Sequence, residues 1–198
     1  MSESDEILIS RCRRGDERSF DILFDRYKGR IYTFILRFVK DEKIAEDLFQ
    51  ETFIRIFRKA RHFRHQAKFS TWLYTIAANL CRDELKKRRR RQVFSLDAPA
   101  AQQKGESRLS SRMQAISDSS EGPRQQAEKR ELSRMLMLAL DELPENSRLV
   151  IELHVMHGLR YREVAEILKC PIGTVQSRMH NAVQLLRKKV QRKLSKPS

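Results

Sequence analysis

Apolar residues recur at steps of three and four along most of the chain, which is the period of amphipathic α-helices. A long helix is predicted where one stripe contains Phe20, Leu23, Phe24, Tyr27, Ile31 and Ile35. A second helix is expected after Asp41, a residue type that caps helix N-termini, and a third over 68–91. Because Gly and Pro are also scarce, with six and five residues, the pattern predicts an all-α protein.

The same period continues near the C-terminus. Leu132, Leu136 and Leu140 share one predicted helix, and the segment ENSRLVIELHVMHG (145–158) forms another. Two shorter helices follow, with the apolar stripes Val164, Ala165, Leu168 and then Val175, Met179, Ala182, Leu186.

These two shorter helices are separated by KCPIG, residues 169–173. Pro171 is expected to end the first helix, Gly173 to permit a tight turn, and Thr174 to cap the second helix. Opposite its apolar stripe the second helix carries Gln176, Ser177, His180, Asn181 and Gln184. The pattern is that of a helix-turn-helix, whose second helix can read base edges in the DNA major groove. An ordinary helical hairpin with a solvated polar side fits these residues alone equally well.

Residues 93–127 interrupt the helical pattern. They are rich in Ser, Gln, Ala and Gly and almost free of aromatic residues, so they cannot bury enough surface to fold alone. We therefore predict two small helical domains, 1–92 and 128–198, joined by a flexible linker over 93–127. The helix-turn-helix belongs to the second domain.

The charge narrows the choice of partner. The chain carries 41 basic and 26 acidic residues, a net charge of +15, which favours nucleic acid or an anionic membrane surface. No membrane insertion is expected, since apolar runs such as 135–140 are far shorter than the roughly 20 residues that span a bilayer. The acidic start MSESDEILIS lacks the basic region of a signal peptide.

The candidate chemistry is sparse. Cys12, Cys81 and Cys170 are scattered without CxxC spacing, which favours a reducing cytoplasm, and Cys81 falls on an apolar stripe. His154 and His157 with Cys170 lack a fourth ligand and a metal-site spacing, so no metal and no cofactor are expected. A DNA-processing enzyme is disfavoured because the sequence shows no carboxylate pair, nucleophile arrangement or Gly-rich phosphate loop.

The predicted helix after Asp41 has an acidic outer face. Its inward stripe is Ala45, Leu48, Thr52 and Ile56, which leaves Asp47, Gln50, Glu51 and Ile54 mostly outward. Such a face on a basic protein would not touch DNA. It fits either a solvated surface or a protein-docking surface.

The helix over 68–91 combines aromatic and basic residues. Its expected core stripe is Leu73, Ile76, Ala77 and Leu80, and its other faces carry Thr71, Trp72, Tyr74, Asn79, Arg82 and Lys86 ahead of the basic run 86–91. Aromatic rings beside cations suit single-stranded nucleic acid, because a base stacks on a ring while Lys or Arg holds a phosphate. Together with Phe63, this helix favours a nucleic-acid partner.

Taken together, these motifs resemble a bacterial RNA polymerase sigma factor of the extracytoplasmic-function (ECF) group. AEDLFQETFIRIFR (45–58) is similar to the polymerase-binding helix of that family, and FRHQAKFSTWLYTIAANLCRDELKKRRRR (63–91) to its −10 promoter segment. LDELPENSRLVIELHVMHGLRYREVAEILKCPIGTVQSRMHNA (140–182) is similar to its −35 domain. Three motifs in order make a specific match, which covers nearly the whole chain except the linker and the extreme ends.

The resemblance assigns roles to residues. It implies that Asp47, Gln50, Glu51 and Ile54 dock on the largest-subunit clamp of core RNA polymerase, whose flap is a further contact. The −10 element would be opened and a flipped base captured by residues around the loop 63–69: Phe63, Lys68, Ser70, Thr71, Trp72, Tyr74, Asn79, Arg82 and Lys86. The −35 element would be contacted by Thr174, Gln176, Ser177, Arg178, His180 and Asn181, with Arg178 and Asn181 nearer the backbone.

The family also implies control by an anti-sigma factor and no catalysis by the chain itself. Four positions depart from the family pattern: Asn181, Thr75 and Ala78 replace residues that are often basic, and Lys169 replaces a frequent Gly. The alternative function is a stand-alone helix-turn-helix regulator that binds duplex DNA without polymerase. That alternative leaves the acidic face of 47–54 and the aromatic-basic helix unexplained.

Overall fold

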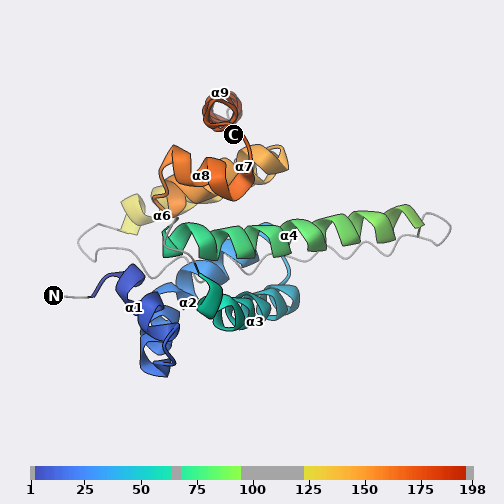
Figure 1. Ribbon diagram of the computed structural model, residues 1–198. Helices are drawn as coiled ribbons and strands as arrows, with labels where there is room; N and C mark the ends of the chain where they lie inside the picture. Colours follow the sequence, from blue (N-terminus) through green and yellow to red (C-terminus); the bar gives the residue numbers. More distant parts are fainter. Residues whose placement is uncertain (1–2, 64–67, 95–122, 195–198) are drawn as a thin grey trace. The chain divides into compact units, whose positions relative to one another are not determined.

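The computed structural model describes residues 3–63, 68–94 and 123–194 (Figure 1). The first group of helices is α1 (Asp5–Cys12), α2 (Glu17–Val39), α3 (Glu42–Lys59), the 3-10 turn η1 (Ala60–His62) and α4 (Phe69–Phe94). The second is α6 (Pro123–Asp141), α7 (Glu145–Ile151), the π-helix η3 (Glu152–Met156), α8 (Tyr161–Leu168) and α9 (Ile172–Leu194). The predicted all-α class is confirmed, since the described ranges contain no strand.

The described helices form two compact units. The first contains α1 to α4, with residues 162–169 grouped with it, and the second contains α6, α7, η3 and α9. Helix covers both edges of the segment predicted as a linker, because α4 runs to Phe94 and α6 begins at Pro123. The rest of that segment, 95–122, lies outside the described residues.

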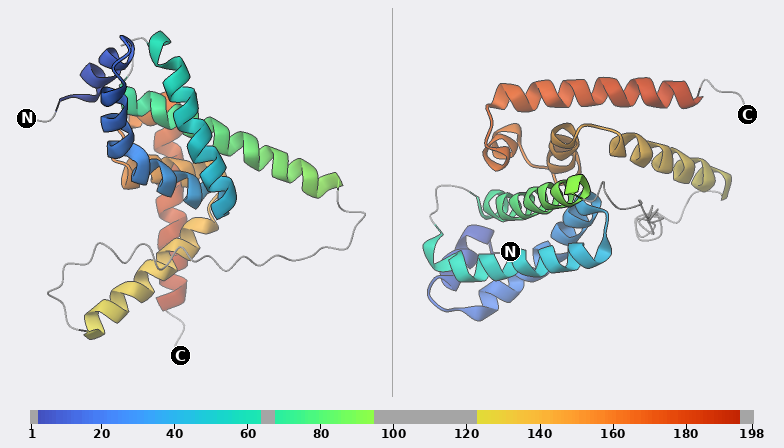
Figure 2. Two further views of the ribbon diagram at one scale, coloured as in Figure 1. Left: turned by 90° about the horizontal axis from the view of Figure 1, so that it is seen from below. Right: turned by 90° about the vertical axis from the view of Figure 1, so that its right-hand side faces the viewer.

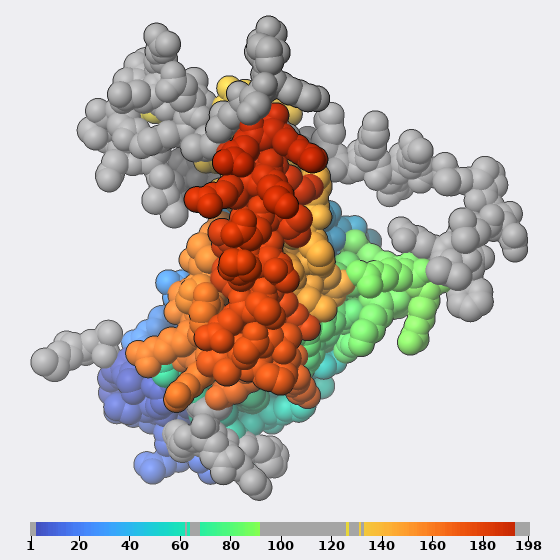
Figure 3. Space-filling model, turned by 90° about the horizontal axis from the view of Figure 1, so that it is seen from above, coloured from blue at the N-terminus to red at the C-terminus, as the bar shows by residue number. Residues whose placement is uncertain are grey.

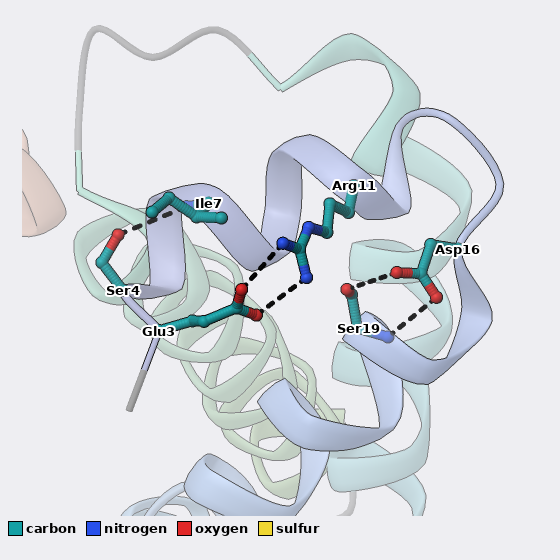
Figure 4. Close-up of polar contacts among 6 residues, drawn as sticks. All are labelled: Glu3, Ser4, Ile7, Arg11, Asp16 and Ser19. Atoms are coloured by element: carbon teal, nitrogen blue, oxygen red, sulfur yellow. Dashed lines mark hydrogen bonds and ion pairs between the residues drawn. The ribbon is translucent and has the colours of Figure 1, made fainter. Parts of the chain in front are cut away.

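Side-chain caps explain where α1 and α2 begin (Figure 4). The Ser4 hydroxyl accepts a hydrogen bond from the Ile7 amide at 3.4 Å, and a two-pronged ion pair joins Glu3 to Arg11 at 2.7 and 2.9 Å. Asp16 accepts hydrogen bonds from the hydroxyl and the amide of Ser19, and these bonds hold the pKa of its carboxyl below the usual value. These contacts satisfy amide groups that a helix start leaves unpaired. The sequence pattern did not reveal α1.

A tight corner joins α2 to α3. Lys40 takes the left-handed conformation (φ 56°) that commonly ends a helix, and its amide donates to the Leu36 carbonyl at 2.8 Å. The next residue, Asp41, accepts a hydrogen bond from the Ile44 amide at 3.0 Å. The predicted N-cap of α3 is therefore confirmed.

The core of the first unit lies where α2 packs against α1, α3 and α4. Edge-on aromatic pairs fill it: Phe24 and Phe53 have ring centroids 4.7 Å apart, and Phe34 and Tyr74 have theirs 5.5 Å apart. Cys81 is fully buried as expected from its stripe, and burial raises the pKa of its thiol to about 12. This thiol therefore serves as a small apolar core residue.

In the second unit, α6 and α7 pack against α9. The buried side chains of this unit include Leu140, Leu143, Leu149, Val150, Leu153, Val175, Met179 and Ala182. A ring nitrogen of His154 lies 2.7 Å from the Leu159 carbonyl, and its ring packs on Tyr161 with centroids 4.4 Å apart. His154 thus stabilises the turn before α8, which accounts for it without a metal.

The turn between α8 and α9 differs from the prediction. The residue with left-handed backbone is Lys169 (φ 51°), not Gly173, which lies inside the first turn of α9. Thr174 is not the cap, since its amide donates to the Pro171 carbonyl at 2.9 Å and it is already helical. Pro171 directly precedes α9, and α8 ends earlier, at Leu168. The apolar stripe of α9 is confirmed, with Val175 and Ala182 fully buried.

Candidate nucleic-acid and protein interfaces

The outer face of α3 carries the predicted acidic surface. Asp47, Gln50 and Ile54 are exposed, and the Glu51 side chain is 42% exposed with its carboxylate 2.6 Å from the Arg55 guanidinium. The opposite face is anchored by Ala45, Thr52 and Ile56, all fully buried. Thr52 keeps its hydroxyl satisfied by donating to the Leu48 carbonyl at 2.7 Å. The predicted orientation of α3 is confirmed, and the four residues form one accessible surface on a fixed helix.

An aromatic cluster surrounds Trp72 at the start of α4. The Trp72 ring lies 4.8 Å from the ring of Phe63 and 6.2 Å from that of Phe69, measured between centroids. Phe63 and Phe69 are buried, whereas Trp72 is half-buried. Trp72 is therefore the accessible ring of the cluster. Phe69 was predicted only as the end of the loop 63–69 and not as a separate contact, although its position three residues before Trp72 indicates a shared helix face.

Contacts through Tyr27 connect this cluster to α1. Phe69 packs edge-on against Tyr27 with ring centroids 5.4 Å apart. The Tyr27 hydroxyl donates a hydrogen bond to Asp5 of α1, and Arg26 pairs with the same carboxylate at 2.6 Å. Burial, followed by the hydrogen bond to Asp5, raises the pKa of Tyr27 above its usual value, so the phenol stays protonated. A continuous set of contacts thus runs from Asp5 to Trp72.

Two predicted outward residues of α4 lie inside the core. Thr71 is 3% exposed and Tyr74 is 2% exposed, while Ile76, expected in the core, is half-buried. The prediction that Thr71 and Tyr74 face outward is wrong, because α4 packs against α1, α2 and α3 and its buried face is wider than one stripe. Ala78 is also fully buried, so this chain leaves no solvent access for a cation at that position.

The remaining predicted −10 residues are accessible to different degrees. Lys68 and Lys86 are exposed, whereas Ser70, Asn79 and Arg82 are half-buried. The Arg82 guanidinium donates to the Asn79 side-chain oxygen at 3.4 Å. Within the predicted loop 63–69, residues 64–67 lie outside the described residues.

The basic run at the end of α4 is not uniform. This half of the helix extends beyond α1 to α3 (Figure 2), and Lys86, Lys87, Arg89, Arg90 and Arg91 are exposed along it. Arg88 instead donates to the Val39 carbonyl at 2.9 Å and lies 3.4 Å from Asp41 and 3.3 Å from Glu84. Because Asp41 caps α3, Arg88 ties α4 to the α2–α3 corner.

This difference makes a stability prediction. Arg88→Ala is expected to lower the free energy of unfolding by about 1–2 kcal/mol, since it removes charge-assisted hydrogen bonds to a half-buried corner. Arg90→Ala, on the same helix but exposed, is the matched control and should change it by less than about 0.5 kcal/mol. Urea unfolding followed by fluorescence of Trp72, the single tryptophan, measures both. Equal effects of the two variants would contradict the role given to Arg88.

The outer face of α9 is polar and open. Gln176, Ser177, His180 and Asn181 are all exposed. Figure 3 shows one face of α9 (orange to red) uncovered along the helix. Thr174 is half-buried. Arg178 is half-buried as well, because its guanidinium turns to the Cys170 sulfur at 3.7 Å. The predicted outward positions are confirmed for the other four residues.

The described ranges contain neither a cluster of metal-binding side chains nor a membrane-spanning helix. No three His, Cys, Asp or Glu side chains there gather closely enough to hold a metal ion. No helix among the described residues has the length and apolarity that crossing a membrane requires.

The family models of sigma-70 region 2 and sigma-70 region 4 match residues 23–91 and 133–186. The RNA polymerase sigma-H factor of Pseudomonas aeruginosa is 35% identical over 189 residues, which cover 96% of this chain and 95% of that protein. The ECF RNA polymerase sigma-E factor of Escherichia coli K12 is 34% identical over 194 residues, covering 96% of this chain and 97% of that protein. The chain belongs to the ECF group of sigma-70 factors. As an ECF sigma factor it works with RNA polymerase in promoter-specific transcription initiation, and the stand-alone regulator is set aside.

Two solved structures share the fold of this sigma factor. CnrH in complex with the cytosolic domain of CnrY aligns with a TM-score of 0.67 at 22% identity, covering 96% of this chain and 98% of CnrH. The sigma factor RpoE in complex with the anti-sigma factor NepR from Bartonella quintana aligns with a TM-score of 0.65 at 24% identity, covering 88% and 98%.

Proposed function

We propose that this sigma factor divides its task among three surfaces. The outer face of α9 reads the −35 duplex, the outer face of α3 docks on core RNA polymerase, and the start of α4 opens the −10 element. The domain boundaries 1–92 and 128–198 are proposed accordingly, with 93–127 between them. The observation that carries this proposal is the segregation of charge: the acidic surface lies on α3, while the cations gather on α4 and α9.

The α3 surface suits a protein partner. Asp47, Gln50 and Glu51 present two carboxylates and an amide beside the exposed apolar side chain of Ile54, which is 43% exposed. Carboxylates repel phosphate, so this face is unsuited to DNA, whereas an apolar centre with a charged rim is typical of protein interfaces. Its proposed partner is the largest-subunit clamp of core polymerase, with the flap as a second contact elsewhere on the chain.

The α4 surface suits an unpaired strand. Trp72 offers a ring face on which a flipped base of the non-template strand can stack, and Lys68 and Lys86 offer charge for its phosphates. Thr71 and Tyr74 shape the site from within the core and do not contact DNA. Unstacking a base costs a few kcal/mol, which stacking on the protein offsets.

The α9 surface suits a duplex. The N-terminal residues of a recognition helix contact base edges, and Gln176, Ser177 and His180 lie in the first turns of α9. Arg178 and Asn181 contact the backbone, with Thr174 at the rim. Amide, hydroxyl and imidazole groups both donate and accept hydrogen bonds, which reading base edges requires.

Three further parts of the proposal come from the family and its relatives. The protein acts in the cytoplasm and has no catalytic activity of its own. Since CnrH and RpoE are each solved with a second protein, and NepR is an anti-sigma factor, we propose that an anti-sigma factor also binds this chain.

Base reading by α9 is tested by single substitutions. Gln176→Ala or His180→Ala is expected to weaken binding to the preferred −35 sequence by roughly 1–3 kcal/mol for each base that is no longer read, and to relax preference at one base position. Affinities for a set of −35 variants, measured with polymerase holoenzyme, give the result. Gln184→Ala, exposed on the same face but farther along α9, is the control. An equal loss on every variant would show that these residues contact the backbone instead.

A further inference from the structure

The recognition helix is longer than its match to the family. Sigma-70 region 4 matches this chain up to residue 186, whereas α9 continues as RKKVQRKL to Leu194. Over its whole length α9 carries six Lys and Arg residues and no Asp or Glu. The electrostatic field around this helix therefore favours an anion at every turn, and most strongly beyond residue 186.

The added cations share the face that reads DNA. At 100° per residue, Arg187, Lys188 and Arg192 fall on the same side of α9 as His180 and Gln184. The exposure agrees, because all five side chains are exposed.

One cation of the same run is placed differently. Lys189 falls on the opposite side of α9 and is half-buried, and its ammonium group contacts the carboxylate of Glu142. The structure thus separates neighbouring lysines into an outward one, Lys188, and one engaged within the unit, Lys189. A run of cations that only favoured the helix C-terminus would not need this alignment.

Helix geometry indicates what the outward cations reach. A rise of 1.5 Å per residue places Lys188 about 18 Å along the axis from Gln176. The major groove is about 12 Å wide, so residues this far from the base-reading end lie beyond the groove, over its phosphate rim. Cations held there neutralise phosphates and release counterions, which strengthens binding without regard to sequence.

We propose that Arg187, Lys188 and Arg192 form a second DNA contact, which grips the phosphate backbone of the duplex flanking the −35 element. The proposal rests on the proposed function in one respect, that the first turns of α9 face the −35 duplex. It adds a contact that positions the helix and lengthens the DNA footprint. The ligand is duplex DNA, recognised through its phosphates.

The test uses full-length protein bound to core polymerase and −35 duplexes at several salt concentrations. The triple variant Arg187→Gln/Lys188→Gln/Arg192→Gln should lower the slope of log affinity against log salt by about 0.9 for each phosphate that the protein no longer neutralises. The loss should be the same on every −35 variant. Lys189→Gln, its matched control, should leave the slope unchanged. An unchanged slope in the triple variant would overturn the proposal, and weaker binding to core itself would assign this face to polymerase instead.

A second measurement varies the DNA rather than the protein. The duplex is shortened from the flank that the C-terminal part of α9 is proposed to cover. This should reduce the DNA affinity of the wild type to that of the triple variant. The DNA affinity of the triple variant should not fall further. Equal losses for both proteins would overturn the proposal. Failure of base reading is separately visible: if Gln176→Ala left sequence preference unchanged while the salt slope still fell in the triple variant, the proposed function of the first turns would be wrong and the phosphate contact would stand.

Discussion

Glu51→Lys is expected to abolish binding to core RNA polymerase while leaving the fold of the sigma factor intact. The substitution reverses a charge within the surface formed by Asp47, Gln50, Glu51 and Ile54. A like charge forced into a protein interface costs several kcal/mol, so the dissociation constant for core should rise by at least about 100-fold.

The fold should tolerate this change because Glu51 and its partner Arg55 are both more than 40% exposed. An exposed ion pair contributes about 0–1 kcal/mol, and a like-charge pair one turn apart costs only a few tenths. Helical content and urea unfolding should therefore stay close to wild type.

Glu42→Lys is the matched control. It makes the same charge reversal on the same helix, and Glu42 is exposed, but it lies on the opposite side of α3, about 180° around the helix from Glu51. Titration of labelled protein with core polymerase compares the two. Unchanged binding by Glu51→Lys, or equal losses in both variants, would remove the docking role of this face.

The second large effect is expected at Trp72. Trp72→Ala should leave duplex binding unchanged but impair promoter opening, since the accessible ring of the Phe63–Trp72 cluster is removed. Base-on-ring stacking is worth about 1–3 kcal/mol per base, and the unstacked state should be destabilised by that amount. The equilibrium between closed and open promoter should shift by a factor of about 5 to 150.

The measurement pairs a fluorescent base in the −10 non-template strand with binding to a single-stranded −10 oligonucleotide. Both signals should weaken in Trp72→Ala, whereas affinity for the −35 duplex stays. Trp72→Phe keeps a ring at the same place and should restore most of the opening. Normal melting by Trp72→Ala, or a defect in Trp72→Phe of the same size, would argue against a stacking role.

Trp72 could be predicted as a site residue from the sequence, but the aromatic rings that it contacts could not. A single Trp among cations indicates nucleic acid, and that inference needs only residue types. That its ring rests on Phe63 and Phe69, and that Phe69 rests on Tyr27 held by Asp5, depends on four separate segments meeting.

The sequence by itself determined the helices other than α1, and the outward faces of α3 and α9. Each of these helices buries one stripe, so a period of 3.6 residues decides which side chains point to solvent. For the same reason Asp41 could be predicted as a cap, because capping is a local contact between residues three apart.

Only the tertiary structure decided which faces of α4 are buried, where α8 turns into α9, and what Arg88 does. Thr71 and Tyr74 lie inside because three helices pack around α4, and a single-stripe pattern cannot register several partners. The left-handed residue of the turn is Lys169 and not Gly173, because α9 begins at Ile172 and Gly173 is already helical. Arg88 donates to the carbonyl of Val39, forty-nine positions away. The sequence does not distinguish it from the other basic residues of the run 86–91. The period of apolar residues identifies one buried face for each helix. Burial and long-range hydrogen bonds depend instead on how many other elements pack against that helix.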